Sequence, residues 1–192
     1  IPNKGLRGMI KFFFLALVAV AAFLFMNLYG SSLGRYSINN IQQTAETTRW
    51  WIGYASGDQG SAYSLGGAGG GIGGMIAQFP AAIVVTFFRP FPWEAGKVIV
   101  LLSALEALLF AWITLRLLFI VGFRKAWATI NADPTIQFCF IFALVFGFAV
   151  GYTSANFGAL SRYKIPCLPF YALGILLTWY KNKPAKKLLP FL

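Results

Sequence analysis

Long runs without charge constrain this chain more than any other feature of its sequence. Residues 12–29 contain no charged side chain, and most of them are Phe, Leu, Ala or Val. A helix of ~20 apolar residues crosses the ~30 Å hydrocarbon core of a bilayer. We therefore predict a transmembrane helix here, retained as a span because it is too long for the apolar region of a signal peptide.

Two further runs have the same character. Residues 98–115 are interrupted only by Glu106 and are followed by Arg116. Residues 136–152 begin after Asp133 and a proline, which is a helix-start signal. Both runs are predicted to span the membrane.

Two shorter runs are ambiguous by length. Residues 167–180 end in aromatic residues followed by lysines, which is how a span meets a charged interface, so we predict a short span. Residues 75–88 contain Gln78 and Pro80 and could either cross the membrane or dip in and return. Within the third long run, Gly147 and Gly151 form a flat strip that another helix could approach closely.

The distribution of positive charge favours one topology. The chain of 192 residues has 16 Lys and Arg against 5 Asp and Glu. If residues 75–88 are re-entrant, ten positive residues lie on the cytoplasmic side and six lie outside; a fifth span reverses the balance to seven against nine. We expect an all-α polytopic membrane protein with four transmembrane helices plus a re-entrant or fifth short helix, both termini of this segment being cytoplasmic.

Composition removes several classes of function. The chain has no histidine, which excludes His-ligated metal sites and catalytic Ser-His or Cys-His pairs. Cys139 and Cys167 lack metal-ligand spacing and are interpreted as buried apolar residues. No metal or cofactor is expected. The positive residues sit at span ends without a continuous stripe, so nucleic-acid binding is not expected either.

We interpret residues 1–192 as a single membrane domain, expected to be part of a longer chain. Its main polar region is an extracytoplasmic loop over residues 31–74. Residues 39–52 are predicted to form an amphipathic interfacial helix. The glycine run at residues 66–74 is interpreted as a flexible tether, because the Lys-Ser/Thr of a phosphate-binding loop does not follow it.

Two short polar corners carry the candidate ligand-binding residues. Arg89, Trp93 and Glu94 lie in a proline-containing turn, where Glu94 could pair with Arg89 or with Lys97, or Arg89 could bind a phosphate group through its guanidinium fork. Arg162 and Lys164 lie in the second corner, at residues 156–166, which the four-span topology places on the same side. Cations among aromatic residues at a membrane surface suit a lipid phosphate or a lipid-linked diphosphate sugar, although simple interfacial anchoring is the alternative.

Glu106 lies at the centre of a predicted span. A carboxylate there costs ~2.5–3.5 kcal/mol on insertion scales, so it needs a partner from another helix or from the part of the longer chain that is expected outside residues 1–192. It could be a structural hydrogen-bonded group, or a general base or proton relay. Glu106 and Glu94 are the candidate catalytic residues.

The order of these motifs resembles a known family. Asp58–Tyr63, the turn from Phe88 to Glu94, a helix with a central Glu and the segment from Asn156 to Lys164 are similar to the C-terminal half of poorly characterised bacterial inner-membrane proteins. Those proteins are associated with cell-surface polysaccharide synthesis and are glycosyltransferase-like or polymerase-like. The resemblance implies a role in envelope glycan assembly.

The sequence therefore leaves two hypotheses. In the first, the protein handles a polyprenyl-diphosphate-linked glycan, with Arg89, Arg162, Lys164 and Trp93 as the binding residues. In the second, it is a non-catalytic accessory subunit of a larger membrane complex. Whether it is an enzyme is left open.

Overall fold

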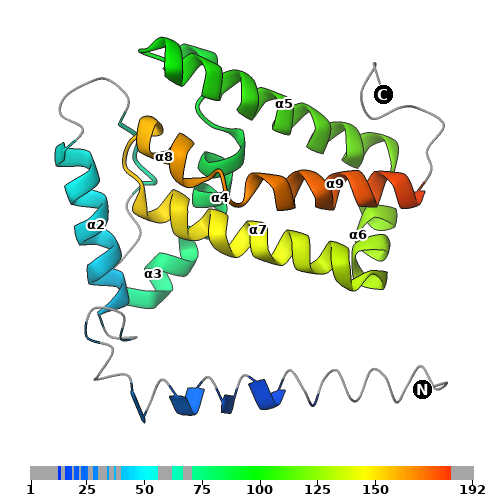
Figure 1. Ribbon diagram of the computed structural model, residues 1–192, viewed down its shortest axis with the longest axis horizontal. Coiled ribbons are helices and arrows are strands. Elements are labelled where there is room, and N and C mark those ends of the chain that lie inside the picture. The colour runs from blue at the N-terminus through cyan, green and yellow to red at the C-terminus, as the bar shows by residue number, and fades with distance from the viewer. Residues whose placement is uncertain are drawn as a thin grey trace. The chain divides into compact units, whose positions relative to one another are not determined.

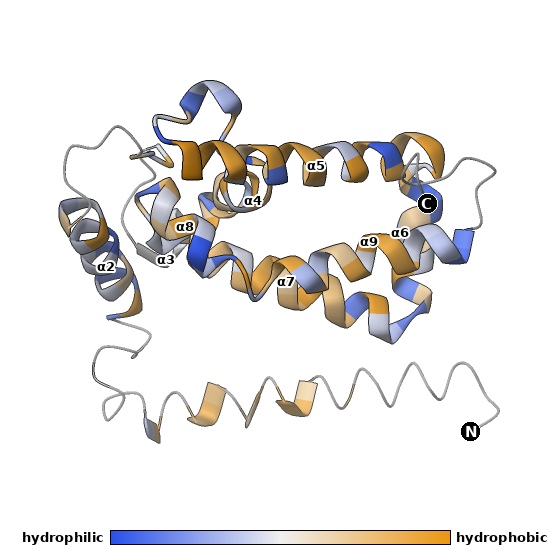
Figure 2. Cartoon of the chain, turned by 45° about the horizontal axis from the view of Figure 1, so that its top comes forward, coloured by the Kyte–Doolittle hydropathy of each residue, from blue (hydrophilic) through white to orange (hydrophobic). Residues whose placement is uncertain are grey.

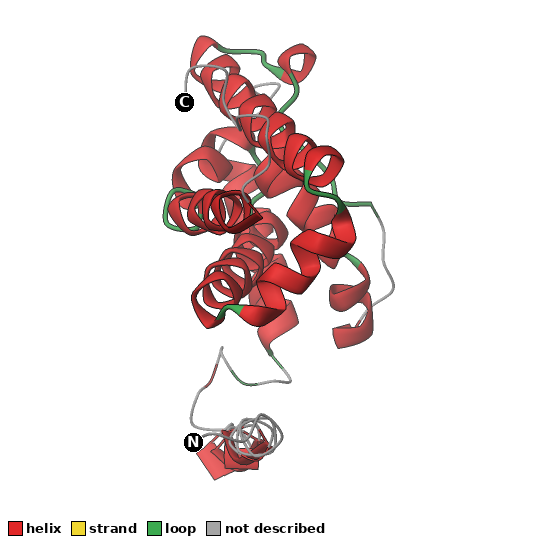
Figure 3. Cartoon of the chain, turned by 90° about the vertical axis from the view of Figure 1, so that its right-hand side faces the viewer, coloured by secondary structure: helices red, strands yellow, loops and turns green. Residues whose placement is uncertain are grey.

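The computed structural model describes residues 40–55, 62–66 and 71–182, together with scattered residues between 13 and 37. Of the predicted span at residues 12–29, eleven residues are described and all of them are helical; the other seven lie outside the described residues. The chain divides into two compact units, Ile1–Glu46 and Thr47–Leu192, and the description below concerns the second. Every regular element in the described part of the chain is a helix (Figures 1 and 3).

The helices follow one another with short connections. In chain order they are α2 (Ile41–Ala55), α3 (Gly71–Ala77), α4 (Phe79–Phe88), the 3₁₀ turn η2 (Pro92–Glu94), α5 (Val98–Ile120), α6 (Phe123–Ala132), α7 (Pro134–Thr153), α8 (Phe157–Tyr163) and α9 (Leu168–Asn182). The predicted interfacial helix at 39–52 is thus confirmed as a helix. Residues 71–74, which we predicted as part of the tether, begin α3 instead.

α5 and α7 are long and apolar enough to cross a membrane, and no other helix in the described residues meets that test. Only 33% and 39% of the residues in their most apolar windows are buried. Figure 2 shows that both helices are apolar along most of their length. α5 continues past the predicted end at residue 115. Arg116 does not stop it, because its guanidinium folds back over the Trp112 ring at 5.0 Å.

Local sequence sets the start of α7 as predicted. The Asp133 carboxylate accepts hydrogen bonds from the backbone N–H groups of Thr135 and Ile136, at 2.7 and 3.3 Å. These are two of the N–H groups that a helix leaves without internal partners. The following proline costs nothing at this position, since its missing N–H would have had no partner.

The two glycines of α7 allow α4 to pack against it at backbone distance. A side chain at Gly151 would overlap the Ala82 carbonyl and the Thr86 hydroxyl, and a Cβ at Gly147 would lie 2.7 Å from the Phe87 ring. The Thr86 hydroxyl lies 2.7 Å from the Gly147 carbonyl oxygen and donates across the contact. The predicted close approach of a helix is therefore confirmed, and the approaching helix is α4.

Residues 75–88 do not form one helix. The helix breaks at Gln78, and α4 then begins with Pro80 in its first turn, where proline is tolerated. α4 has 10 residues, about 15 Å of helix, which is half the thickness of a hydrocarbon core. It is therefore too short to cross a bilayer alone.

α8 and α9 together follow α5 along its length. Phe157 lies in one buried cluster with Val100, Lys164 pairs with Glu106, and the Tyr171 hydroxyl lies 2.9 Å from that of Thr114. Each of these pairs is separated by 57 or 58 residues, so the two segments run in the same direction as α5. The sequence predicted only the second helix, at 167–180; the turn at residues 164–167 separates it from α8.

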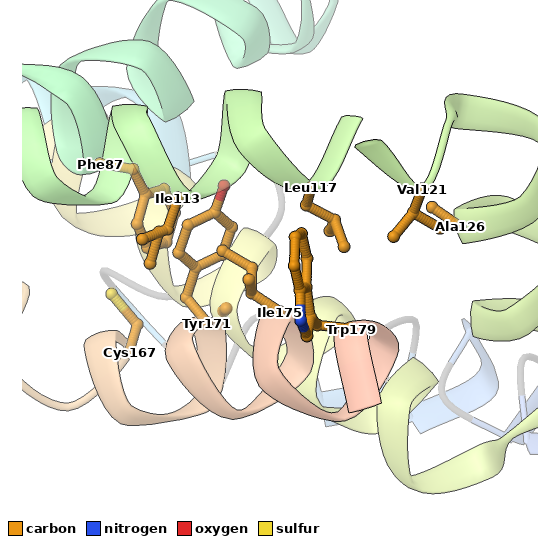
Figure 4. Packing of buried hydrophobic residues seen from close by; sticks show 10 residues of the cluster. Phe87, Ile113, Leu117, Val121, Ala126, Cys167, Tyr171, Ile175 and Trp179 are labelled. Carbon is orange, nitrogen blue, oxygen red and sulfur yellow. The ribbon is translucent and has the colours of Figure 1, made fainter. Parts of the chain in front are cut away.

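The core between these helices is aromatic. Tyr171 stacks on Phe87 of α4 at 4.3 Å and also contacts Phe110 of α5 at 5.8 Å. Figure 4 shows Ile113 and Leu117 pointing from α5 toward α9. Buried Tyr171, which belongs to α9, thus contacts both α4 and α5.

Candidate functional site

The turn between α4 and α5 holds the first pair of predicted site residues. Arg89 donates to Glu94 through both Nε, at 3.1 Å to Oε2, and Nη2, to Oε1. The Phe91 backbone N–H also donates to Glu94 Oε2, at 2.8 Å. Of the partners left open by the sequence, Glu94 therefore takes Arg89. The guanidinium is held as a fork around a carboxylate, which is the geometry with which arginine also binds phosphate.

This pairing sets the chemistry of Glu94. The hydrogen bonds from Arg89 hold the pKa of the Glu94 carboxyl below its ordinary value, against the opposing effect of partial burial. A lowered pKa makes a carboxylate a weaker base. The geometry therefore favours Glu94 as the group that orients Arg89 rather than as a proton acceptor.

Arg89 also belongs to a row of cations and aromatic rings. Its guanidinium lies 5.3 Å from the centre of the Phe157 ring, and that ring stacks on Tyr63 at 5.0 Å. The guanidinium of Arg49 in turn lies 5.8 Å from the centre of the Tyr63 ring. We call these four residues the Arg–aromatic row. Its members come from α2, residues 62–66, the end of α4 and the start of α8.

Backbone contacts hold the row in place. Tyr63 N–H donates to the Ala155 carbonyl at 3.0 Å, and its hydroxyl donates to the Gly151 carbonyl at 3.1 Å. Arg49 donates to the carbonyls of Tyr152 and Tyr63, both at 3.3 Å. Burial raises the pKa of Tyr63 although both arginines act to lower it, so the phenol stays neutral and remains a donor.

The second pair joins Glu106 to Lys164. Lys164 Nζ lies 2.8 Å from Glu106 Oε1, and the lysine side chain is 1% exposed while that of Glu106 is 41% exposed. The partner expected for Glu106 from another helix is thus confirmed, and it comes from the turn that follows α8. Neither Lys164 Nζ nor Glu106 Oε1 makes a hydrogen bond within the described residues, so the contact is an ion pair without hydrogen-bond alignment. A buried ammonium of this kind depends on its charge partner.

The remaining two predicted residues stand apart from these pairs. Arg162 is exposed, and its Nε donates to the Gly158 carbonyl at 3.2 Å within α8. Trp93 is 80% exposed and stacks on Phe91 at 4.8 Å. The structure therefore brings together Arg89 with Glu94 and Lys164 with Glu106, and it leaves Arg162 and Trp93 at the surface.

Sequence reasoning did not select Arg49, Tyr63 or Phe157 as site residues. Both aromatic residues lie in the motifs that carry the family resemblance, and the four-span topology places Arg49 on the same side as Arg89. That shared side was the only available signal, because stacking between residues 63 and 157 depends on the tertiary fold. In the described part of the chain, Asp, Glu and Cys side chains gather nowhere in groups of three or more that could hold a metal ion.

Comparisons with protein-family models, with curated proteins and with solved structures found no match. The chemistry assigned to the site therefore depends on its own geometry. That geometry offers a guanidinium fork with two aromatic rings and a second arginine in one row, and separately a buried lysine paired with a partly exposed carboxylate. This arrangement suits the binding of a phosphate-containing group more than it suits acid–base catalysis.

Proposed function

We propose that this chain belongs to a multi-span protein of the bacterial inner membrane that binds a polyprenyl-diphosphate-linked glycan during envelope polysaccharide assembly. The observation that carries the proposal is the Arg89 fork, which is already arranged around an anionic group. The diphosphate would displace the Glu94 carboxylate from Arg89. Because Glu94 is a neighbour in the same short turn, it can rotate away and hydrate without unfolding a helix.

The outward apolar surface supports insertion into a membrane. On α5, the exposed side chains include Ile99, Leu102 and Phe119, and on α7 they include Ile141 and Val145. Exposed apolar surface of this extent along two helices of membrane length is suited to lipid contact. A long helix in the core of a soluble protein would instead be mostly buried.

The contacts along α5 support a four-span topology with a re-entrant segment. Phe87, near the end of α4, stacks on Tyr171, whose ring also contacts Phe110 and whose hydroxyl lies 2.9 Å from that of Thr114 in the middle of α5. Residues 89–97 then return to the start of α5 at Val98. We propose that α4 dips into the bilayer and returns on the side it entered.

The fourth crossing would consist of two helices. α8 enters beside the start of α5, the turn at residues 164–167 lies at the depth of Glu106, and α9 continues to the far side. Irregular backbone at membrane depth is tolerated where protein covers it, and broken helices often carry binding sites near the midplane. Residues 12–29 would provide the first crossing, and both ends of this segment would be cytoplasmic.

In this topology the binding residues share one face of the membrane, outside the cytoplasm. Arg49 would hold further phosphate oxygens near Arg89, and Trp93 would lie at the interface against the prenyl chain. Arg162, which the structure leaves apart from Arg89, is given no phosphate contact. Lys164 and Glu106 lie deeper, where we assign them to supporting the turn between α8 and α9. The resemblance to polysaccharide-synthesis proteins agrees with such a substrate.

An accessory subunit could pack against a helix of another protein through the strip formed by Gly147 and Gly151. However, Gly147 and Gly151 are covered by α4, so they are not free to pack against a helix of another protein. An accessory subunit should nevertheless remain stoichiometric with its partners through detergent extraction and purification. A protein that binds the lipid-linked sugar by itself should purify alone in a form that still binds.

The proposal is tested by direct binding of a fluorescent polyprenyl diphosphate to the purified chain in detergent micelles. We expect Arg89→Ala to weaken binding at least about tenfold, as expected for loss of a charge-assisted fork. Glu94→Gln should bind several-fold more tightly, because it removes the competing carboxylate. Lys181→Gln, which removes a charge at the end of α9 far from Arg89 in the sequence and outside both proposed binding sites, is the matched control and should bind like the wild type.

Two competitors identify the part of the ligand that is recognised. Inorganic diphosphate should compete with the probe, and the uncharged polyprenol should compete poorly. Tighter binding by Glu94→Gln cannot arise from loss of folding, so this variant protects the test against a destabilised Arg89→Ala. If both variants bind like the wild type, or if the polyprenol competes as well as the diphosphate, the assignment to Arg89 is wrong.

A further inference from the structure

α6 follows the end of α5, whereas the Arg–aromatic row lies near the start of α5, and α6 has two distinct faces. It connects the end of α5 to the start of α7. Gly122, which directly precedes α6, has a φ of +86°, a conformation that suits glycine, and α5 ends before it. On one face, Ala126 is buried against the core. On the flank of that face, Phe123 and Trp127 are 68% and 56% exposed and stack on each other at 6.2 Å.

An apolar cavity of about 120 Å³ opens beside these rings. Its walls come from four helices and include Leu117, Leu118, Phe123, Trp127, Phe140 and Ile175. Thr114 and Tyr171, which also line it, have their hydroxyl groups bonded to each other at 2.9 Å. A cavity of ~150 Å³ lined by Leu, Ile and Phe accommodates benzene, so this one suits a few methylene groups of a hydrocarbon chain.

The polar side of α6 carries two cations without acidic partners. Arg124 and Lys125 are both exposed, and neither pairs with a carboxylate in the described part of the chain. The chain has only five acidic residues, and the one that follows α6, Asp133, is paired with Lys181. The charge of this face is therefore available to an anion from outside the chain.

We infer that α6 binds an anionic phospholipid, with the headgroup at Arg124 and Lys125 and part of an acyl chain in the cavity beside Trp127. The inference depends on the proposed membrane insertion but not on the proposed substrate. In the four-span topology α6 is on the cytoplasmic side, where anionic lipids concentrate and attract basic segments. An amphipathic helix with aromatic residues on one face and cations on the other suits this interface.

The test uses the quenching of Trp127 fluorescence by lipids brominated on the acyl chain. The purified chain is placed in phosphatidylcholine vesicles that contain either brominated phosphatidylglycerol or brominated phosphatidylcholine at equal fraction. The contribution of Trp127 is the difference between the wild type and Trp127→Phe. We expect brominated phosphatidylglycerol to quench it more strongly, and salt to reduce this preference.

Arg124→Gln/Lys125→Gln should abolish the preference for phosphatidylglycerol while leaving quenching by brominated phosphatidylcholine unchanged. Each charge near the membrane surface is expected to contribute about fivefold to the affinity for an anionic lipid. Both side chains are exposed, so the double variant should fold. Arg162→Gln, at the other end of the molecule, should keep the preference.

Three results would overturn the inference. Equal quenching by the two brominated lipids would show that no headgroup is selected, and absence of quenching would show that Trp127 does not face lipid. A loss of preference in Arg162→Gln would show that total charge matters rather than α6. None of these results bears on binding of the diphosphate probe at Arg89, so the two proposals fail separately.

Discussion

The two predicted carboxylates of this chain are held in different ways. Glu94 pairs with Arg89, five residues away, in a short turn where both side chains remain partly exposed. Glu106 pairs with Lys164, 58 residues away, and the lysine is almost completely buried. The first pair forms within one local segment, whereas the second exists only because α8 packs against α5.

This difference separates an exchangeable pair from a structural one. When the carboxylate leaves, the Arg89 fork can be solvated or can accept another anion, and its loss costs little. Lys164 has no such choice, because an unpaired ammonium in an apolar interior costs several kcal/mol or must lose its proton. The comparison therefore assigns ligand exchange to Arg89 and Glu94, and fold maintenance to Lys164 and Glu106.

The largest effect should follow from Glu106→Gln. The substitution keeps the shape of the side chain but leaves Lys164 without a charge partner. We expect a loss of roughly 2–4 kcal/mol of stability, less than is usual for a broken buried pair because the Glu106 side chain is partly exposed. Thermal unfolding in detergent should show Tm lower by roughly 5–10 °C.

A double variant separates the loss of the pair from the loss of packing. Glu106→Gln/Lys164→Met removes both charges and keeps a long apolar side chain at the buried position. It should recover most of the lost stability, since a buried pair can be replaced by neutral side chains at little cost. A single variant with unchanged Tm, or a double variant no better than the single one, would contradict the structural role.

A smaller effect should follow from Arg89→Ala. Glu94 keeps its hydrogen bond from Phe91 and gains water, so we expect a loss of about 1 kcal/mol. Arg89→Lys keeps the charge but cannot form the fork, and its Tm should lie between those of Arg89→Ala and the wild type. If Arg89→Ala destabilises the protein as much as Glu106→Gln, the two pairs do not differ as proposed.

The sequence predicted most of the helices, because their signals are local. Asp133 and the proline after it define the start of α7, and uncharged length alone identifies α5. The end of α5 was set too early, since an arginine that stacks on Trp112 one turn before it does not interrupt a helix. α6 and α8 were not predicted, because helices of 10 and 7 residues carry too few turns for a clear apolar pattern.

The sequence predicted the site residues better than it predicted which of them form ion pairs. A turn that places Arg89 and Glu94 five residues apart allows them to meet, so the pair was among the stated alternatives. The need of Glu106 for a partner followed from the cost of a carboxylate in a span. That the partner is Lys164 did not follow, because no local pattern encodes the alignment of α8 and α9 with α5.

The pH dependence of stability should also distinguish the Arg89–Glu94 pair from the Lys164–Glu106 pair. Arg89 holds the pKa of Glu94 below its ordinary value of 4.5. A carboxyl whose pKa is lower in the folded state stabilises the fold above pH ~4.5, and this contribution is lost as the pH falls through the folded-state pKa. The effect should be under about 1 kcal/mol because Glu94 is partly exposed.

The measurement is the difference in Tm between the wild type and Glu94→Gln at a series of pH values. The wild type should be more stable at pH 6, and the difference should shrink as the solution is made more acidic than pH 4. Using the difference cancels the titration of the other carboxyl groups. A difference that does not change with pH would show that Arg89 does not stabilise the charged form of Glu94.

The smallest effect should follow from Lys181→Gln, which breaks the third ion pair of the described residues. Lys181 is largely solvated, and its hydrogen bond is the main reason that the pKa of Asp133 lies below its ordinary value. Asp133 keeps its bonds to the first N–H groups of α7 without the lysine. We therefore expect Lys181→Gln to lower Tm less than Arg89→Ala does, and Asp133→Ala to lower it more than Lys181→Gln, because only Asp133→Ala removes the helix cap. Equal Tm values for Lys181→Gln and Asp133→Ala would show that the pair, and not the cap, is what holds the start of α7.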